Sequence, residues 1–154
     1  MNYVVRRAQD KDLDSLVSFT LAEAREAEGA ELDPSIVRRG VEAGLSNRAI
    51  AMYWVVESGQ GEIVARASAL REWSDWHAQY YWWVQSMYVA PDHRGRGLVE
   101  MLMGTVSAEA RNRGAADLRL YVHEQNSRAI RAYRRCGFSG LPYRIMSKHL
   151  GNGG

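Results

Sequence analysis

The chain has 154 residues, of which 46% are hydrophobic and 25% are charged, and its formal net charge is +2. These values are typical of one folded domain with its own core, so we expect a single domain over residues 1–149 and a flexible tail over residues 150–154. The near-neutral charge indicates no general affinity for nucleic acid or membranes, and the single cysteine, Cys136, excludes an intrachain disulfide.

The sequence shows no targeting or metal signal. Its first residues lack the apolar stretch of a signal peptide, and no apolar run approaches the roughly 20 residues that span a bilayer. The four histidines are not spaced as metal ligands, and a single cysteine fits a reducing compartment. We therefore expect a cytoplasmic protein without a metal.

The N-terminal third predicts one strand and two helices. Residues 2–7 (NYVVRR) are rich in strand-forming side chains, and Asp10 is placed to cap the helix that follows. Pro34 suits the first turn of a second helix, which we expect to end near Leu45. The apolar face of the first helix is predicted from residues at helical spacing: Leu13, Leu16, Val17 and Leu21.

The middle of the chain predicts a hairpin, a long aromatic strand and a helix. Two strand-like runs within residues 48–73 flank the turn ESGQGE, and residues 80–90 (YYWWVQSMYVA) form the next strand, which ends before Pro91. The helix that follows starts at Leu98 with apolar residues at helical spacing, and Gly114 suits its end.

The last third predicts a strand over residues 117–123 (DLRLYVH), a short helix over residues 126–136 and a closing strand over residues 143–150 (YRIMSKHL). Asn126 or Ser127 is placed to cap the short helix. The order of elements along the chain, β-α-α-β-β-β-α-β-α-β, indicates an α/β (α+β) fold in which helices pack against a mixed sheet.

The segment VAPDHRGRGLV joins a strand to a helix and has the properties of an anion site. Gly95 and Gly97 permit unusual backbone angles, and the first amides of a helix have no acceptor within the helix. Such amides, at the positive end of the helix dipole, bind phosphates, and Arg94 and Arg96 add positive charge. The segment is neither a Walker A loop nor a GxGxxG loop. An exposed loop without a ligand is the simpler alternative.

Two motifs resemble the GNAT superfamily of N-acetyltransferases. The first is the acetyl-CoA signature Gln/Arg-x-x-Gly-x-Gly/Ala, from which this chain departs by a valine at the last position. The second is Asn-x-x-Ala-x-x-x-Tyr-x-x-x-Gly-Phe. The resemblance covers nearly the whole chain and implies a mixed, mostly antiparallel central sheet of about six to seven strands flanked by helices, with splayed central strands. The matching positions are Arg94, Gly97 and Val99, then Asn126, Ala129, Tyr133, Gly137 and Phe138.

The resemblance implies transfer of an acetyl group from acetyl-CoA to a primary amine by direct attack in a ternary complex. It implies that Tyr133 protonates the leaving thiolate and that a backbone N–H near Met87 or Tyr88 stabilises the carbonyl oxygen. Tyr133 shares a helical face with Cys136, which also allows a plain packing role. The residues implied to hold acetyl-CoA are Met87, Tyr88, Val89, Arg94, Gly95, Arg96, Gly97, Leu98, Val99, Asn126 and Ala129.

The sequence does not identify the general base that would accept the proton of the amine. Some relatives carry a glutamate on the strand before the turn, where this chain offers Gln85 and Ser86, and an amide is no base at neutral pH. Cys136 has no identifiable partner base, so we expect no acyl-cysteine step. The substitutes for the base are a chain of water molecules or one of Glu72, Asp75, His77, His123 and Glu124.

The acceptor is expected to lie near the aromatic stretch REWSDWHAQYYWW, although ordinary sheet packing accounts for at least half of these rings. The candidate substrate-binding residues are Trp73, Trp76, Tyr81 and Trp83, whose rings would hold a cationic or planar group. Glutamates near the end of the first helix would add negative charge or simply face solvent; they are Glu23, Glu26, Glu28 and Glu31.

We expect the acceptor to be a small amine, an amino acid or a polyamine-like molecule. A protein or peptide acceptor is one alternative, and a CoA-binding regulatory module without catalysis is another. An RNA-binding role for the arginines is disfavoured by the near-neutral charge, so no nucleic-acid partner is expected. A homodimer is left open.

Overall fold

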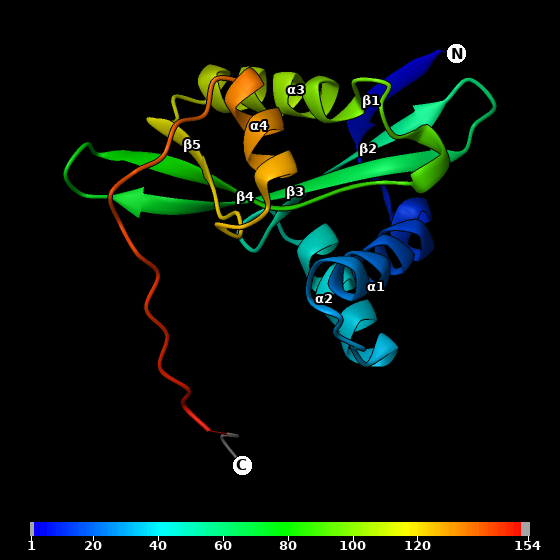
Figure 1. The fold of residues 1–154 in the computed structure, drawn as a ribbon, viewed down its shortest axis with the longest axis horizontal. Coiled ribbons are helices and arrows are strands. Elements are labelled where there is room, and N and C mark those ends of the chain that lie inside the picture. The colour runs from blue at the N-terminus through cyan, green and yellow to red at the C-terminus, as the bar shows by residue number, and fades with distance from the viewer. Residues whose placement is uncertain (1, 152–154) are drawn as a thin grey trace.

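The computed structural model describes residues 2–151 and shows a five-stranded sheet with helices on both faces (Figure 1). Short 3-10 turns precede the first and third helices: η1 (Asp10–Asp12) and η2 (Pro91–His93). The strands are β1 (Tyr3–Arg7), β2 (Met52–Ser58), β3 (Ile63–Ser74), β4 (Gln79–Val89) and β5 (Asp117–Leu120). The helices are α1 (Leu13–Glu28), α2 (Pro34–Ser46), α3 (Leu98–Asn112) and α4 (Ser127–Arg135).

The strands follow one another in the sheet in chain order, β1-β2-β3-β4-β5. Every neighbouring pair is antiparallel except β4 and β5, which run parallel. In Figure 1, α3 lies along one side of the sheet, and α1 and α2 lie on the other side. The expectation of a mixed, mostly antiparallel sheet flanked by helices is therefore confirmed.

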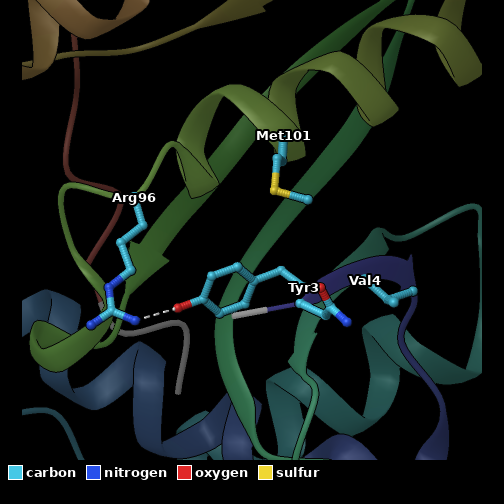
Figure 2. Close-up of a pocket in the computed structure, with 5 residues that line it drawn as sticks. Tyr3, Val4, Arg96 and Met101 are labelled. Atoms are coloured by element: carbon cyan, nitrogen blue, oxygen red, sulfur yellow. Dashed lines mark hydrogen bonds between the residues drawn. The ribbon is translucent and has the colours of Figure 1, made fainter.

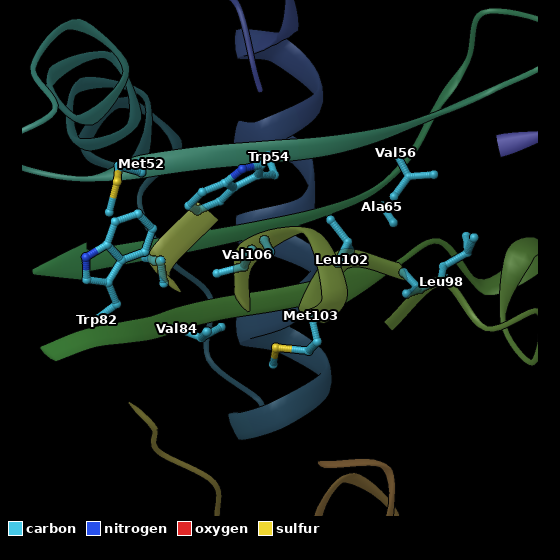
Figure 3. Packing of buried hydrophobic residues seen from close by; sticks show 14 of the residues in the cluster. Met52, Trp54, Val56, Ala65, Trp82, Val84, Leu98, Leu102, Met103 and Val106 are labelled. Carbon is cyan, nitrogen blue, oxygen red and sulfur yellow. The ribbon is translucent and has the colours of Figure 1, made fainter. Parts of the chain in front are cut away.

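Two apolar clusters hold these layers together. The larger joins β2, β3 and β4 to α3 and includes Trp54, Trp82 and Leu102 (Figure 3). The smaller joins α1 and α2 to the other face of the sheet and includes Leu16 and Val55. Strand alternation explains the division, because Trp54 and Val55 are neighbours on β2 and point to opposite faces.

Two helices begin as the sequence predicts. Pro34 opens α2, and the carboxylate of Asp33 before it accepts a hydrogen bond from the Ser35 amide at 2.9 Å. At the start of α4, the side-chain oxygen of Asn126 accepts a hydrogen bond from the Ala129 amide at 3.2 Å. These bonds satisfy amides that have no acceptor inside the helix.

The prediction that Asp10 caps the first helix is wrong, because the chain first forms the turn η1 and the helix begins at Leu13. Asp12, the residue before Leu13, makes no side-chain hydrogen bond to the start of the helix and instead closes the turn. Its carboxylate accepts the Gln9 amide at 2.8 Å and pairs with both terminal nitrogens of Arg6 at 2.8 and 3.0 Å. The strand β1 and the entry to α1 are thereby joined by a charge-assisted pair.

The sheet has five strands rather than six to seven. The strand predicted over residues 117–123 ends at Leu120, and the closing strand predicted over residues 143–150 does not form. A strand forms when its backbone groups pair with a neighbouring strand, and residues 143–150 pair with no described strand. Every residue from 139 to 151 is exposed, so no apolar packing holds this segment against the sheet. Residues 152–154 of the expected tail lie outside the described residues. Within residues 2–151, no helix is long and apolar enough to cross a membrane.

Candidate active site

The strands β4 and β5 run together for only part of the length of β4. They pair over Tyr81–Val84, and beyond this range no described strand pairs with β4 on that side. On its other side, the register with β3 shifts after Ser68, which leaves Gln85 as a bulged residue. Residues 85–89 therefore present an open backbone edge directly before the turn to α3. The strands β4 and β5 thus diverge after Val84, as the expectation of splayed central strands requires.

The turn before α3 is shaped as an anion-binding site. Gly95 and Gly97 have left-handed backbone angles, with φ of 75° and 78°. A Cβ atom at Gly95 would meet nothing within 4 Å, so the backbone at this position is not covered by other groups. The first helical bond runs from the Met101 amide to the Gly97 carbonyl at 3.0 Å. The amides without a hydrogen bond to any described residue, and hence able to bind an anion, include those of Gly95, Gly97, Leu98 and Val99.

Arg94 ties this turn to the sheet and to α1. Its Nε donates to the Val89 carbonyl at 2.9 Å, and its Nη2 lies 3.1 and 3.0 Å from the two carboxylate oxygens of Glu26. The Arg94 amide donates to the Pro91 carbonyl at 3.3 Å. Both its side chain and its amide therefore already have partners within the protein, so the anion-binding capacity of the turn rests on the amides that follow.

Arg96 ties the other side of the turn to β1. Its Nη1 donates to the Tyr3 hydroxyl at 3.0 Å, as Figure 2 shows. The same hydroxyl hydrogen-bonds His93 Nδ1 at 2.9 Å. A shallow groove of about 740 Å³ lies here, lined by Asn2, Tyr3, Val4, Arg96 and Met101. The groove is open to solvent and does not include the edge of β4, so we place the candidate site at that edge and the turn.

Tyr133 lies on α4 and packs half-buried against the larger apolar cluster. Burial raises the pKa of the Tyr133 hydroxyl, and the charges of Glu23 and Cys136 raise it further. A phenol with a raised pKa keeps its proton at neutral pH, as a proton donor must. The C-terminal end of α4 lies beside the start of α3, where Arg135 and Glu100 form an exposed ion pair at 3.6 Å.

A carboxylate from α1 faces the same region. Arg66 of β3 is only 2% exposed, and its Nη2 donates to Glu23 Oε2 at 3.2 Å, while its Nη1 donates to Thr20 Oγ1 at 3.0 Å. Burial raises the pKa of Glu23, although Arg66 and the backbone N–H of Met87 favour its charged form. Glu23 thus brings a half-buried carboxylate to the open edge of β4 and within electrostatic reach of Tyr133.

Sequence reasoning missed the pairing of Glu23 with Arg66. Glu23 was expected to add negative charge near the acceptor or to face solvent, and no role was predicted for Arg66. The available signal was a charged residue in the middle of the apolar run IVARASAL, at a position that strand alternation turns toward a helix. The Nε of Arg66 is the one buried side-chain polar atom among residues 2–151 without a hydrogen-bond partner.

Tyr81 and Trp83 are half-buried and belong to one cluster on the sheet. The guanidinium of Arg119 lies 3.8 Å from the ring centre of Tyr81 and 5.7 Å from that of Trp83. Trp83 stacks on Tyr121 with a centroid distance of 4.5 Å, and its Nε1 donates to Glu72 Oε2 at 2.8 Å. This cluster follows the same face of β4 that carries Ser86 and Tyr88 beyond the bulge.

Trp73 and Trp76 lie elsewhere. Trp73 packs edge-on against Tyr80 at 5.0 Å, and strand alternation places both rings on the face opposite Tyr81. Trp76 lies in the turn between β3 and β4 and is 86% exposed. The structure therefore does not bring the four predicted substrate-binding aromatics into one site.

Several expected site residues have other contacts in this structure. Glu72 is engaged by Trp83, and the His123 Nδ1 accepts the Gln125 amide at 3.1 Å. Asp75 and His77 lie in the exposed turn between β3 and β4, and Glu124 is exposed after β5. Asn126 and Ala129 form the cap of α4, and Leu98 is buried, so that only its backbone faces the turn.

A splayed strand pair followed by an anion-binding helix start, in a mixed sheet covered on both faces, defines the class of acyltransferase fold to which the sequence motifs point. Residues 13–138 match the acetyltransferase (GNAT) family, and the chain belongs to this family. The family resemblance seen in the sequence is thereby confirmed.

Three similar proteins illustrate the relation. Over 107 residues the chain is 35% identical to mycothiol acetyltransferase of Corynebacterium aurimucosum, a match that covers 67% of this chain and 34% of that protein. Over 91 residues it is 28% identical to the L-amino acid N-acyltransferase MnaT of Escherichia coli K12, covering 59% and 53%. The chain thus spans well under two thirds of either relative. The crystal structure of a possible acetyltransferase from Clostridium difficile 630 has a TM-score of 0.91 and 27% identity, covering 99% of this chain and 100% of that one.

Proposed function

We propose that this chain transfers the acetyl group of acetyl-CoA to a small primary amine by direct attack in a ternary complex. The observation that carries the proposal is that Glu23, a half-buried carboxylate, meets the Met87 backbone at the open edge of β4 and lies within electrostatic reach of Tyr133, a phenol that keeps its proton. A module that only bound CoA would need the anion-binding turn and would have no use for this pair.

The turn and the edge of β4 suit the shape of acetyl-CoA. Backbone amides of Gly95, Gly97, Leu98 and Val99 would hold its diphosphate, and no other group covers the backbone at Gly95. The edge over Met87–Val89 would pair through backbone groups with the pantetheine arm. When bound there, acetyl-CoA supplies an activated thioester, and the chain's own residues orient it and move the protons.

The backbone N–H of Met87 stabilises the thioester carbonyl oxygen of acetyl-CoA in this scheme. This N–H faces the Glu23 carboxylate in this structure. A thioester oxygen that takes this donor gains a hydrogen bond that strengthens as negative charge develops on it. Glu23 then keeps its ion pair with Arg66 and remains beside the reacting carbon.

The two protons move through Glu23 and Tyr133. As the C–N bond forms, the amine nitrogen becomes acidic and Glu23 accepts its proton. As the C–S bond breaks, Tyr133 donates its proton to the departing sulfur, so the amine loses one proton and the thiol gains one. Arg66 supports this sequence because its buried positive charge favours the ionised form of Glu23.

A small amine acceptor is supported by charge and by relatives. The carboxylate of Glu23 attracts a cationic amine, and the stacked aromatic rings of Trp83 on β4 and Tyr121 just after β5 lie farther along the sheet. Both curated relatives bear names of acyltransferases that act on small molecules. We place amino acids first in this acceptor class.

The test is acetyl-CoA-dependent thiol release against amino acids, other small amines, polyamines and peptides, combined with calorimetry of acetyl-CoA binding. Saturable binding and release with at least one small amine are expected. Binding without release for any acceptor would replace the enzyme with a regulatory module, and release only with peptides would replace the acceptor class. Absence of binding would refute the cofactor site itself.

A further inference from the structure

Two serine hydroxyls meet on the sheet beside the candidate site. Ser68 of β3 and Ser86 of β4 stand opposite each other in the register, and their Oγ atoms form a hydrogen bond. Strand alternation places Ser68 on the same face as Arg66, which contacts α1. Ser68 is only 2% exposed, whereas Ser86 is half-buried and directly follows the bulged Gln85. The pair therefore lies where the open edge of β4 begins, and no step of the proposed reaction uses it.

The surroundings of Ser68 set the direction of this hydrogen bond. A serine hydroxyl has one proton to donate, and the structure gives Ser68 no other hydrogen bond among the described residues. Of its neighbours on this face, Arg66 only donates, Leu70 is apolar, and the Tyr53 hydroxyl reaches toward α2. If Ser86 donated to Ser68, the buried Ser68 proton would have no acceptor, and an unpaired buried donor is costly. Ser68 is therefore the donor.

The proton of the Ser86 hydroxyl is left for a partner outside the protein. Other hydroxyls nearby already use their protons. Thr20 Oγ1 donates to a carbonyl of its own helix at 2.9 Å, and the Tyr88 hydroxyl faces the Glu26 carboxylate. Ser86 thus presents a hydrogen-bond donor, fixed in direction by Ser68, on the face of β4 that α1 covers.

We propose that the Ser86 hydroxyl donates a hydrogen bond to an oxygen on the carbon next to the α-carbon of the acceptor amine, so that the enzyme selects α-amino acids or their amides over amines without this oxygen. The proposal rests on the proposed function, in which Glu23 meets the amine nitrogen. Ser86 precedes Met87, whose N–H faces Glu23, and successive strand residues are about 3.3 Å apart. Two carbon atoms separate the nitrogen from the oxygens in an α-amino acid, which fits this short spacing.

The chemistry shared by these acceptors is an oxygen that accepts a hydrogen bond. The Ser86 hydroxyl is neutral, and the nearby cations already have partners, because Arg66 pairs with Glu23 and Arg94 pairs with Glu26. A carboxylate oxygen and an amide oxygen both accept from a hydroxyl. A free amino acid and an amino-acid amide are therefore two sources of the same contact, which the test separates.

The test measures kcat/KM by acetyl-CoA-dependent thiol release for matched forms of one side chain: the L-amino acid, its amide, and the amine that lacks the carbonyl group. The sets are built on alanine, leucine and phenylalanine. Ser86→Ala should lower kcat/KM about 10-fold for acceptors with the oxygen and less than about 2-fold for the plain amines. Comparing each variant with the wild type on the same acceptor at one pH cancels the differences in basicity among acceptors. The larger loss, on the acid or on the amide, identifies the source of the oxygen.

Three further variants separate this contact from a structural effect. Ser86→Thr keeps the hydroxyl and should keep the wild-type selectivity. Ser68 is a positioning residue, so Ser68→Ala should give a smaller loss with the same acceptor pattern, mainly in KM. Ser107→Ala is the matched control, because Ser107 is a half-buried serine on α3, on the other side of the sheet, and it should match the wild type on every acceptor. Calorimetry should find the Kd of acetyl-CoA unchanged in all four variants.

The outcomes separate this inference from the proposed function. Equal losses on all three forms of a side chain in Ser86→Ala would overturn it and assign the hydroxyl to the thioester. Unchanged rates with the acids and amides, or turnover by the wild type of other amines alone, would overturn it as well. Acetyl transfer itself would stand in each of these cases. Absence of thiol release with every amine would remove the proposed function and this inference with it.

Discussion

Replacing Glu23 with glutamine tests the proposed proton path, because it removes the charge and keeps the volume. The glutamine oxygen still accepts from Arg66 Nη2, which lies 3.2 Å from Glu23 Oε2, so the local packing should persist. A positioned general base contributes about 10²–10⁴-fold to rate, so kcat should fall by that factor, equivalent to about 3–5 kcal/mol. Calorimetry should find the Kd of acetyl-CoA unchanged.

The pH profile of kcat/KM makes this prediction sharper. Burial raises the pKa of Glu23, and the active form is the ionised one, so activity is lost as the pH falls through that raised value. The acidic limb of the wild-type profile should therefore lie at a higher pH than an unperturbed glutamate would produce. Glu23→Gln should abolish this limb. A weakly basic amine is used as acceptor, so that its own protonation does not mask the effect.

Glu28→Gln is the matched control, because Glu28 lies at the end of the same helix and is exposed. It should keep the wild-type rate and profile. A Glu23→Gln enzyme with wild-type kcat and an unchanged acidic limb would refute the reasoning and assign the proton to water or to another residue.

Other substitutions test neighbouring parts of the structure. Tyr133→Phe should lower kcat by about 10²-fold in the thiol-release assay with no change in acetyl-CoA affinity, and an unchanged kcat would leave it a packing residue. Gly97→Ala places a side chain at φ 78°, so denaturant titration should show a loss of about 1–2 kcal/mol and the KM for acetyl-CoA should rise. Arg66→Met removes the cation that favours ionised Glu23, and the acidic limb of kcat/KM should move to higher pH. Leu102→Ala empties a fully buried position of the larger cluster and should lower the free energy of unfolding by about 2–5 kcal/mol, with catalysis retained below the unfolding midpoint.

The elements that local signals define were predictable. Pro34 and Asn126 sit at helix starts because their chemistry suits those positions wherever the helix packs. The left-handed angles at Gly95 and Gly97 follow equally from local chemistry, since glycine adopts them without a steric penalty. The turn before α3 could therefore be recognised before its surroundings were known.

Pairings between distant residues could not be predicted in the same way. Glu23 and Arg66 are 43 positions apart, and Arg94 and Glu26 are 68 apart, so no spacing rule connects them. Arg94 was expected to face a phosphate, and tertiary packing gives it Glu26 as a partner. The closing strand over residues 143–150 was predicted from composition alone, and a strand also needs an edge to pair with.

The helix α1 joins the two halves of the candidate site. Glu23 and Glu26 are three residues apart and so lie on one face of the helix. Glu23 holds Arg66 in the sheet, and Glu26 holds Arg94 in the turn, so two ion pairs fix α1 against both β3 and the anion-binding loop. Phe19 of the same helix adds a ring contact at 5.2 Å with Tyr88 on β4. The position of the proposed base is therefore tied to the turn proposed to hold the cofactor, because one rigid helix is bound to both.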